Sequence, residues 1–140
     1  MGARRTARER ALQALYQLEI ADGQPGDALA TAWAASPESE GADPETRRFA
    51  LQLVDGVRSH LQEIDALIQS FSHHWRIDRM TRVDRNVLRL GIFELKYLPE
   101  IPRSVSIDEA VELGRRFGTE DSPAFVNGLL DRIAQALQKA

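Results

Sequence analysis

The stretch RFGTEDSPAFVNGLLD, residues 116–131, has the pattern of one helix ending, a tight corner and a second helix beginning. Phe117 closes a series of apolar residues at helical spacing, and Gly118 is predicted to adopt the left-handed conformation that often ends a helix. Ser122 is expected to cap the next helix, with Pro123 at its first position, where a backbone N–H has no intrahelical partner to lose. The apolar face of the second helix consists of Phe125, Val126, Leu129, Leu130 and Ile133.

Two residues of this second helix are unfavourable for helical structure. Asn127 is a poor helix former, and Gly128 costs about 1 kcal/mol relative to alanine. In a structural interpretation, another helix packs closely over Gly128 while Asn127 hydrogen-bonds a neighbouring backbone group. In a functional interpretation, the corner forms a pocket lined by Asp121 and Phe125. The two interpretations are compatible, and the residues leave both open.

Apolar residues at three- and four-residue spacing predict further helices over residues 3–21 and 28–35. A similar stripe over residues 44–73 fits either one long helix or two short helices broken near Ser59. Between residues 83 and 98, apolar residues cover most of the helical circumference, which is typical of a central helix buried on several sides.

Local signals place several residues within this pattern. Trp33 is expected to anchor the short helix to the core, and residues 36–41 read as a loop. Asp43 is a good N-cap for the helix that follows it. Ser106 and Glu109 have the spacing of a capping box at the start of a later helix.

A second group of polar residues follows the apolar stripe. Adjacent His73 and His74 point about 100° apart on a helix and make a poor metal pair, so surface histidines flanking a buried Trp75 are expected. The arginines beyond them form either a charged edge balanced by carboxylates or an extension of an anion-binding surface. They are Arg76, Arg79, Arg82, Arg85 and Arg89.

Length and composition limit the possible classes of protein. A chain of 140 residues, 43% of them hydrophobic, is long enough for one domain with its own core. It has no cysteine, which excludes disulfides and thiolate chemistry and fits a reducing cytoplasm. No apolar run approaches the roughly 20 residues that span a bilayer, and the start of the chain does not have the pattern of a secretory signal. We therefore expect a cytoplasmic protein without a membrane segment.

Arginines gather at the start of the chain. Residues 1–10 have a net charge of +3, whereas the whole chain has a formal net charge of −3. The helix dipole disfavours cations at a helix N-terminus, so a cluster placed there indicates an anionic partner. A solvated helix end without a role is the alternative.

No catalytic or cofactor-binding motif is recognisable. The chain lacks a glycine-rich phosphate loop, a zinc-binding His-Glu-x-x-His and a nucleophile elbow. An arginine-rich helix end, Tyr16 on the same helix and a corner with Asp121 and Phe125 suit the binding of single-stranded RNA, which combines phosphate contacts with stacked bases. The residues favour a non-enzymatic protein with no cofactor, metal or small-molecule substrate.

Four motifs occur in order along the chain. They are RExALQALY at residues 8–16, VxxxVLRLxxFEL at 83–95, IPxxVxIxEAxEL at 101–113 and FGxEDSxxFVNGxLD at 117–131. On these motifs the chain resembles the NusB family of transcription antitermination factors, and the match is weakest over residues 22–45. The resemblance implies a single all-α domain, residues 1–140, of about seven helices in two packed helical subdomains, about 1–72 and 73–140. It also implies two helices within residues 44–73.

The resemblance further implies a function and a set of site residues. Members of the family bind the boxA element of ribosomal RNA leader transcripts together with the ribosomal protein NusE, in a complex that keeps RNA polymerase elongating through terminators. By motif, Arg4, Arg5 and Arg8 fall on the family's arginine-rich segment. Asp84 falls beside the surface associated with RNA and NusE, and Asp121 is assigned to hydrogen bonds with base edges. The positions on the RNA face are Gln13, Tyr16, Asp121 and Phe125.

Two alternatives remain open from the sequence. The chain could be an RNA-binding accessory domain that works with an enzyme modifying ribosomal RNA, since a similar helical domain precedes some methyltransferases. It could instead form a homodimer in which the RNA face is masked.

Overall fold

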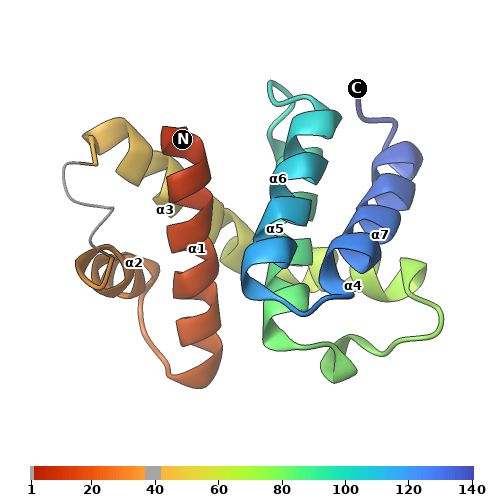
Figure 1. Cartoon of the computed structure of the whole chain (residues 1–140), viewed down its shortest axis with the longest axis horizontal. Coiled ribbons are helices and arrows are strands. Elements are labelled where there is room, and N and C mark those ends of the chain that lie inside the picture. Colours follow the sequence, from red (N-terminus) through yellow and green to blue (C-terminus); the bar gives the residue numbers. More distant parts are fainter. Residues whose placement is uncertain (1, 37–41) are drawn as a thin grey trace. The chain divides into compact units, whose positions relative to one another are not determined.

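The described part of the chain is entirely helical. A computed structural model describes residues 2–36 and 42–140, so the loop predicted over residues 36–41 lies, apart from residue 36, outside the described residues. The prediction of an all-α fold is confirmed (Figure 1). The elements are α1 (Ala3–Ile20), α2 (Pro25–Ala34), α3 (Pro44–Ser59), α4 (Leu61–Phe71), the 3-10 turn η2 (Ile77–Arg79), α5 (Arg82–Tyr97), α6 (Arg103–Phe117) and α7 (Ser122–Ala136).

Two compact units make up the chain, Met1–Arg58 and Ser59–Ala140. The expected subdomain boundary near residue 72 falls one helix later than the division between these units. The apolar stripe over residues 44–73 forms two helices, α3 and α4, as the resemblance implied. His60 lies between them with non-helical backbone angles (φ −116°, ψ 23°).

The first unit consists of α1, α2 and α3. Helices α1 and α2 pack against each other, and the small side chains of Ala7 and Ala11 on α1 are completely buried. Trp33 on α2 is buried, as predicted, and the guanidinium of Arg47 lies 4.8 Å from the centre of its ring.

Helix α5 is the centre of the second unit. Helices α4, α6 and α7 all contact it, and each residue from Asn86 to Leu95 is buried. Ten consecutive buried residues cover the helix surface all round, which confirms the predicted central helix. The approach to α7 is close at Gly91, where a Cβ atom would lie 2.6 Å from a methyl group of Leu130.

Three helix-terminus predictions are wrong, at Ser106, at Gly118 and, in the site described below, at Ser122. Ser106 does not cap α6, which begins three residues earlier at Arg103. Its buried hydroxyl instead donates a 2.8 Å hydrogen bond to the Glu94 carboxylate of α5. Ser106 therefore serves as the hydrogen-bond donor to a buried carboxylate and not as a helix cap.

Gly118 is the second incorrect prediction. It follows α6 with extended backbone angles (φ −98°, ψ −157°) and does not adopt the left-handed conformation. A Cβ atom at this position would lie 2.3 Å from the Ser122 hydroxyl and 2.8 Å from the Gly114 carbonyl oxygen. Glycine is required here because the corner leaves no space for a side chain.

The crowding at the corner predicts a difference between two glycine substitutions. Gly118→Ala should lower the free energy of unfolding by roughly 1–3 kcal/mol, because the added methyl group overpacks the corner. Gly128→Ala, within α7, should instead raise it by about 0.5–1 kcal/mol through helix propensity, because the added Cβ atom makes only an ordinary contact. Urea unfolding of both variants measures the difference. Equal changes in the free energy of unfolding would contradict the crowding at Gly118.

Asp43 caps α3, as predicted. Its carboxylate accepts hydrogen bonds from the backbone N–H (2.8 Å) and the hydroxyl (2.7 Å) of Thr46. These bonds, helped by the charge of Arg48, hold the pKa of Asp43 below its ordinary value. The ionised carboxylate therefore stabilises the fold at pH values above the ordinary pKa of aspartate. This stabilisation is lost as the pH falls through the lowered pKa of Asp43.

We expect the loss of this cap to depend on pH. Asp43→Ala should lower the melting temperature at neutral pH, and its difference from the unmodified chain should shrink below about pH 4, where aspartate is protonated. Asp43→Asn is the matched control, because asparagine also caps helices but does not titrate in this range. Parallel melting curves for all three proteins across this range would contradict the assignment.

Within residues 2–36 and 42–140, no helix is both long and apolar enough to cross a membrane.

Candidate nucleic-acid interface

The arginines at the start of α1 differ in their exposure. Arg4 is exposed, Arg5 is half-buried, and only 4% of Arg8 is exposed. The guanidinium groups of Arg4 and Arg8 lie over the ring of Phe49 on α3, with their carbon atoms 4.2 and 5.5 Å from its centre. The aromatic ring therefore holds two of the three cations in place, and Arg4 presents the more accessible one.

The surface around Arg4 carries charges of both signs. A groove of about 490 Å³ beside it is lined by Arg48, Glu45 and Asp55 of α3 as well as by Phe49. The carboxylates disfavour a phosphate deep in this groove. An anion would bind more favourably to the solvent-exposed guanidinium of Arg4 outside this groove.

Gln13 and Tyr16 lie further along α1, one helical turn apart. The Gln13 side-chain oxygen accepts a 2.9 Å hydrogen bond from the Arg10 guanidinium. Tyr16 is 40% exposed, although it stands among the apolar residues of this helix. Its ring is therefore accessible for stacking.

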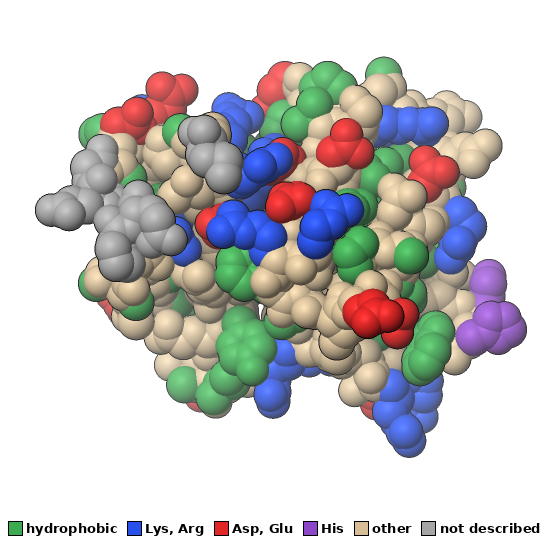
Figure 2. Space-filling view, in the orientation of Figure 1, with side chains coloured by type: hydrophobic (Ala, Val, Ile, Leu, Met, Phe, Trp, Pro, Cys, Tyr) green, Lys and Arg blue, Asp and Glu red, His purple; other side chains and the backbone are tan. Residues whose placement is uncertain are grey.

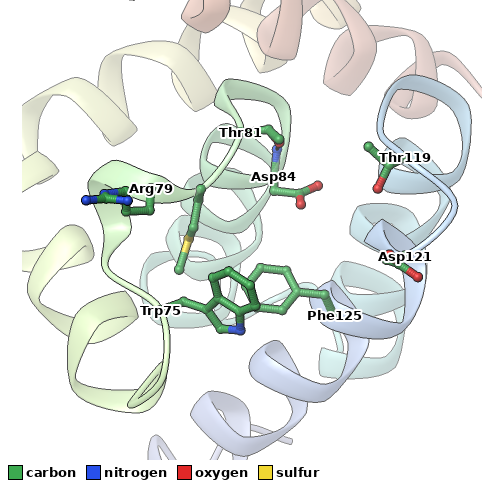
Figure 3. A pocket seen from close by; sticks show the side chains of 8 residues that line it. Trp75, Arg79, Thr81, Asp84, Thr119, Asp121 and Phe125 are labelled. Carbon is green, nitrogen blue, oxygen red and sulfur yellow. Dashed lines mark hydrogen bonds between the residues drawn. The ribbon is translucent and has the colours of Figure 1, made fainter.

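In the second unit, the structure brings together Asp84, Asp121 and Phe125. They line a pocket of about 240 Å³, which we call the corner pocket. Figure 3 shows the side chains of Asp84 and Asp121 around the same pocket as those of Trp75 and Phe125. The other lining residues are Arg79, Met80, Thr81 and Thr119. The predicted pocket at this corner, lined by Asp121 and Phe125, is thus present.

The two carboxylates of the corner pocket have different surroundings. Asp84 accepts a 2.6 Å hydrogen bond from the buried hydroxyl of Ser122, which in turn accepts one of 2.9 Å from the Thr119 backbone N–H. Ser122 is the first residue of α7, so it links α7 to α5 and does not serve as the predicted N-cap. Among the described residues, the exposed carboxylate of Asp121 has no hydrogen-bonding partner and is available to a ligand.

Trp75 was predicted to be buried, and this prediction is wrong. The residue is 59% exposed in the turn after α4 and lines the corner pocket. Helix α4 ends at Phe71, so the apolar stripe that would have buried Trp75 does not reach it. The adjacent polar His73 and His74, with Arg76 following, were the available sequence signal for exposure.

The five arginines from Arg76 to Arg89, here called the arginine stripe, include two with structural contacts, Arg85 and Arg89. Arg89 is buried and forms a double hydrogen bond with Asp65 of α4, at 2.8 and 2.9 Å. Arg85 donates to the backbone carbonyl groups of Ile77 and Met80. Arg79, in contrast, is exposed and lines the corner pocket, so this member of the stripe is accessible to an anion.

The structural interpretation of Asn127 and Gly128 is wrong. Asn127 is exposed and has no hydrogen-bonding partner among residues 2–36 and 42–140. A Cβ atom at Gly128 would meet only the Arg132 guanidinium, at an ordinary contact distance of 3.8 Å. Neither residue is explained by close packing.

The Ser122 hydrogen bonds predict a large effect of a small substitution. Ser122→Ala should lower the free energy of unfolding by roughly 1–3 kcal/mol, because it leaves the Thr119 N–H and an Asp84 oxygen without their partner. Ser70→Ala is the control, since its exposed hydroxyl bonds only to the Leu67 carbonyl oxygen. Urea unfolding that shows equal losses for the two variants would contradict this role of Ser122.

Comparison with known proteins identifies the class. The fold is all-helical, with an arginine-rich helix start in one unit and a pocket of aromatic and carboxylate side chains in the other. The NusB family model matches residues 5–135, and the chain belongs to the NusB family.

Relatives and solved structures agree with this assignment. The chain is 67% identical over 139 residues to the transcription antitermination protein NusB of Myxococcus xanthus, covering 99% of each sequence. It is similar to a structure of T. maritima NusB, with a TM-score of 0.84 and 39% identity over 94% of this chain and 90% of the other. A structure of the antitermination factors NusB and NusE in complex with double-stranded RNA has a TM-score of 0.84 and 32% identity, covering 97% and 98% of the two chains.

Proposed function

We propose that this protein is a non-enzymatic, RNA-binding transcription antitermination factor. It binds a boxA-type single-stranded element of ribosomal RNA leader transcripts together with NusE, and the complex keeps RNA polymerase elongating. The observation that carries the proposal is the similarity, over 97% of this chain, to a NusB that was solved with NusE and RNA. The site of action is then the cytoplasm, where transcripts are made.

The corner pocket is the base-reading part of the proposed interface. The Phe125 ring can stack a nucleobase, an interaction worth about 1–3 kcal/mol. An ionised carboxylate only accepts hydrogen bonds, so Asp121 favours a base that presents an exocyclic amine at this point. Asp84 is already bound to Ser122, and its role is to fix the wall of the pocket beside the NusE-binding surface.

The start of α1 supplies the phosphate contacts. Arg4 and Arg5 are the accessible cations, and stacking on Phe49 restricts the movement of Arg4 before RNA arrives. The buried Arg8 also lies over the Phe49 ring and is less accessible to phosphate than Arg4. Gln13 and Tyr16 extend the RNA face along the helix, with Tyr16 available for a second stacked base.

The proposal is tested by fluorescence anisotropy of a labelled boxA RNA at two salt concentrations, with and without NusE. Binding should weaken as salt rises and tighten when NusE is added. Arg4→Ala should lower the magnitude of the salt slope by about 0.7, the value for one lost contact to single-stranded phosphate.

The controls separate RNA contacts from effects on folding. Arg103→Ala removes the same charge at the start of α6, away from the corner, and should leave the slope unchanged. Arg8→Ala should act mainly through stability, because the side chain is buried. A salt slope that is the same for the Arg4 variant and the unmodified chain would remove the arginine cluster from the mechanism. The absence of any RNA binding, even with NusE, would refute the proposed function.

A further inference from the structure

Trp75 and Phe125 form a wall between two cavities. On one side is the corner pocket, and on the other is a groove of about 380 Å³, which we call the histidine groove. The histidine groove is lined by His73, His74, Trp75, Phe125, Leu129 and Arg132, among others. Both aromatic side chains therefore face two separate binding spaces.

The two cavities differ in their charged groups. The corner pocket contains the carboxylates of Asp84 and Asp121 together with Arg79, whereas no described residue that lines the histidine groove is acidic. His73, His74 and Arg132 give the groove nitrogen atoms that can donate hydrogen bonds. Figure 2 shows histidine side chains projecting at one edge of the view, where Figure 1 has the turn after α4. This groove suits an anion.

Arg132 of α7 is hydrogen-bonded to the end of α4. Its Nη2 atom donates a 3.3 Å hydrogen bond to the carbonyl oxygen of Phe71, at the end of α4. Its Nη1 atom lies over Gly128, 3.8 Å from where a Cβ atom would be. A guanidinium group has five N–H donors, so this single hydrogen bond leaves most of them available to a ligand.

Exposure of Trp75 provides the second argument. A tryptophan that is 59% exposed keeps a large apolar face in water, which is unfavourable unless a partner covers that face. The combination of an exposed aromatic ring, imidazole rings and a guanidinium group matches the side chains on which single-stranded RNA bases stack and to which its phosphates bind. A purely apolar protein partner would not require this cationic lining.

We propose that the RNA strand continues from the corner pocket over Trp75 into the histidine groove. The indole of Trp75 stacks a nucleobase that flanks the one read by Asp121, and Arg132 binds the phosphate next to it. This inference rests on the proposed function, because it extends the same strand, and it adds Trp75, Arg132 and the two histidines to the interface.

The chain offers a direct optical test of stacking. It contains two tryptophans, and Trp33 is buried in the other unit, so Trp33→Phe leaves Trp75 as the single tryptophan. The full chain with this substitution is titrated with boxA RNA and with boxA RNA extended at its 5′ or 3′ end, while anisotropy of the labelled RNA reports binding. We expect the emission of Trp75 to fall as one of the extended RNAs binds.

Affinity measurements provide the matching energetic test. In the otherwise unmodified chain, Trp75→Ala should weaken binding of that extended RNA by about 5- to 150-fold, the range for one lost base stack, and Trp75→Phe should restore most of it. Arg132→Ala should lower the salt slope for the extended RNA and leave that for the short RNA unchanged. Arg103→Ala is the matched control for charge.

The outcomes separate this inference from the proposed function. Binding of every RNA with unchanged Trp75 emission, or equal losses for short and extended RNA, would overturn the continuation of the strand while leaving the proposed function in place. A change in emission on adding NusE, with none on adding RNA, would assign the groove to a protein partner and would also overturn it. The absence of RNA binding by anisotropy would refute both.

Discussion

Burial of α5 on several sides is the constraint on which the second unit depends. A helix in the centre of a helical unit can carry polar side chains only if each is paired, because an unpaired buried charge or hydrogen-bonding group is costly. Three polar residues of α5 meet this requirement with a partner on a different helix. The pairs are Asp84 with Ser122 of α7, Arg89 with Asp65 of α4, and Glu94 with Ser106 of α6. The same interactions that satisfy α5 therefore fix the positions of the three helices around it.

This arrangement explains why the two carboxylates of the corner pocket differ in their hydrogen bonding. Asp84 belongs to the framework of paired groups, and its hydrogen bond to Ser122 places the start of α7 next to the start of α5. Asp121 comes just before α7 and projects from that fixed point, with no partner among the described residues. A ligand that binds Asp121 thus meets a hydrogen-bond acceptor whose position is already fixed. The entropic cost of ordering this acceptor on binding is therefore smaller.

Periodicity was sufficient to predict the helical class and the central position of α5, because these follow from which residues are apolar. It did not divide residues 44–73 into α3 and α4, which the family resemblance implied. The N-cap at Asp43 was predictable because its partner is three residues away. Ser106 and Gly118 were misjudged because their roles depend on contacts across the fold, with Glu94 of another helix and with the crowded corner. Trp75 was misjudged because periodicity cannot locate the end of α4. For the site, the motifs indicated three residues of the corner pocket, and the histidine groove could be recognised only from the structure.

Asn127 and Gly128 are unfavourable residues within α7, and packing does not explain them. Glycine within a helix costs about 1 kcal/mol relative to alanine, and here neither close packing nor a hydrogen bond of Asn127 within the described residues offsets that cost. The Arg132 guanidinium lies over Gly128 and lines the histidine groove, so a side chain longer than that of alanine would crowd it at this position. Because no contact within the described residues offsets this cost in helix stability, we infer that a contact with a binding partner offsets it. On this argument the exposed face of α7 is shaped for a bound partner, and its sequence reflects the requirements of binding more than those of folding.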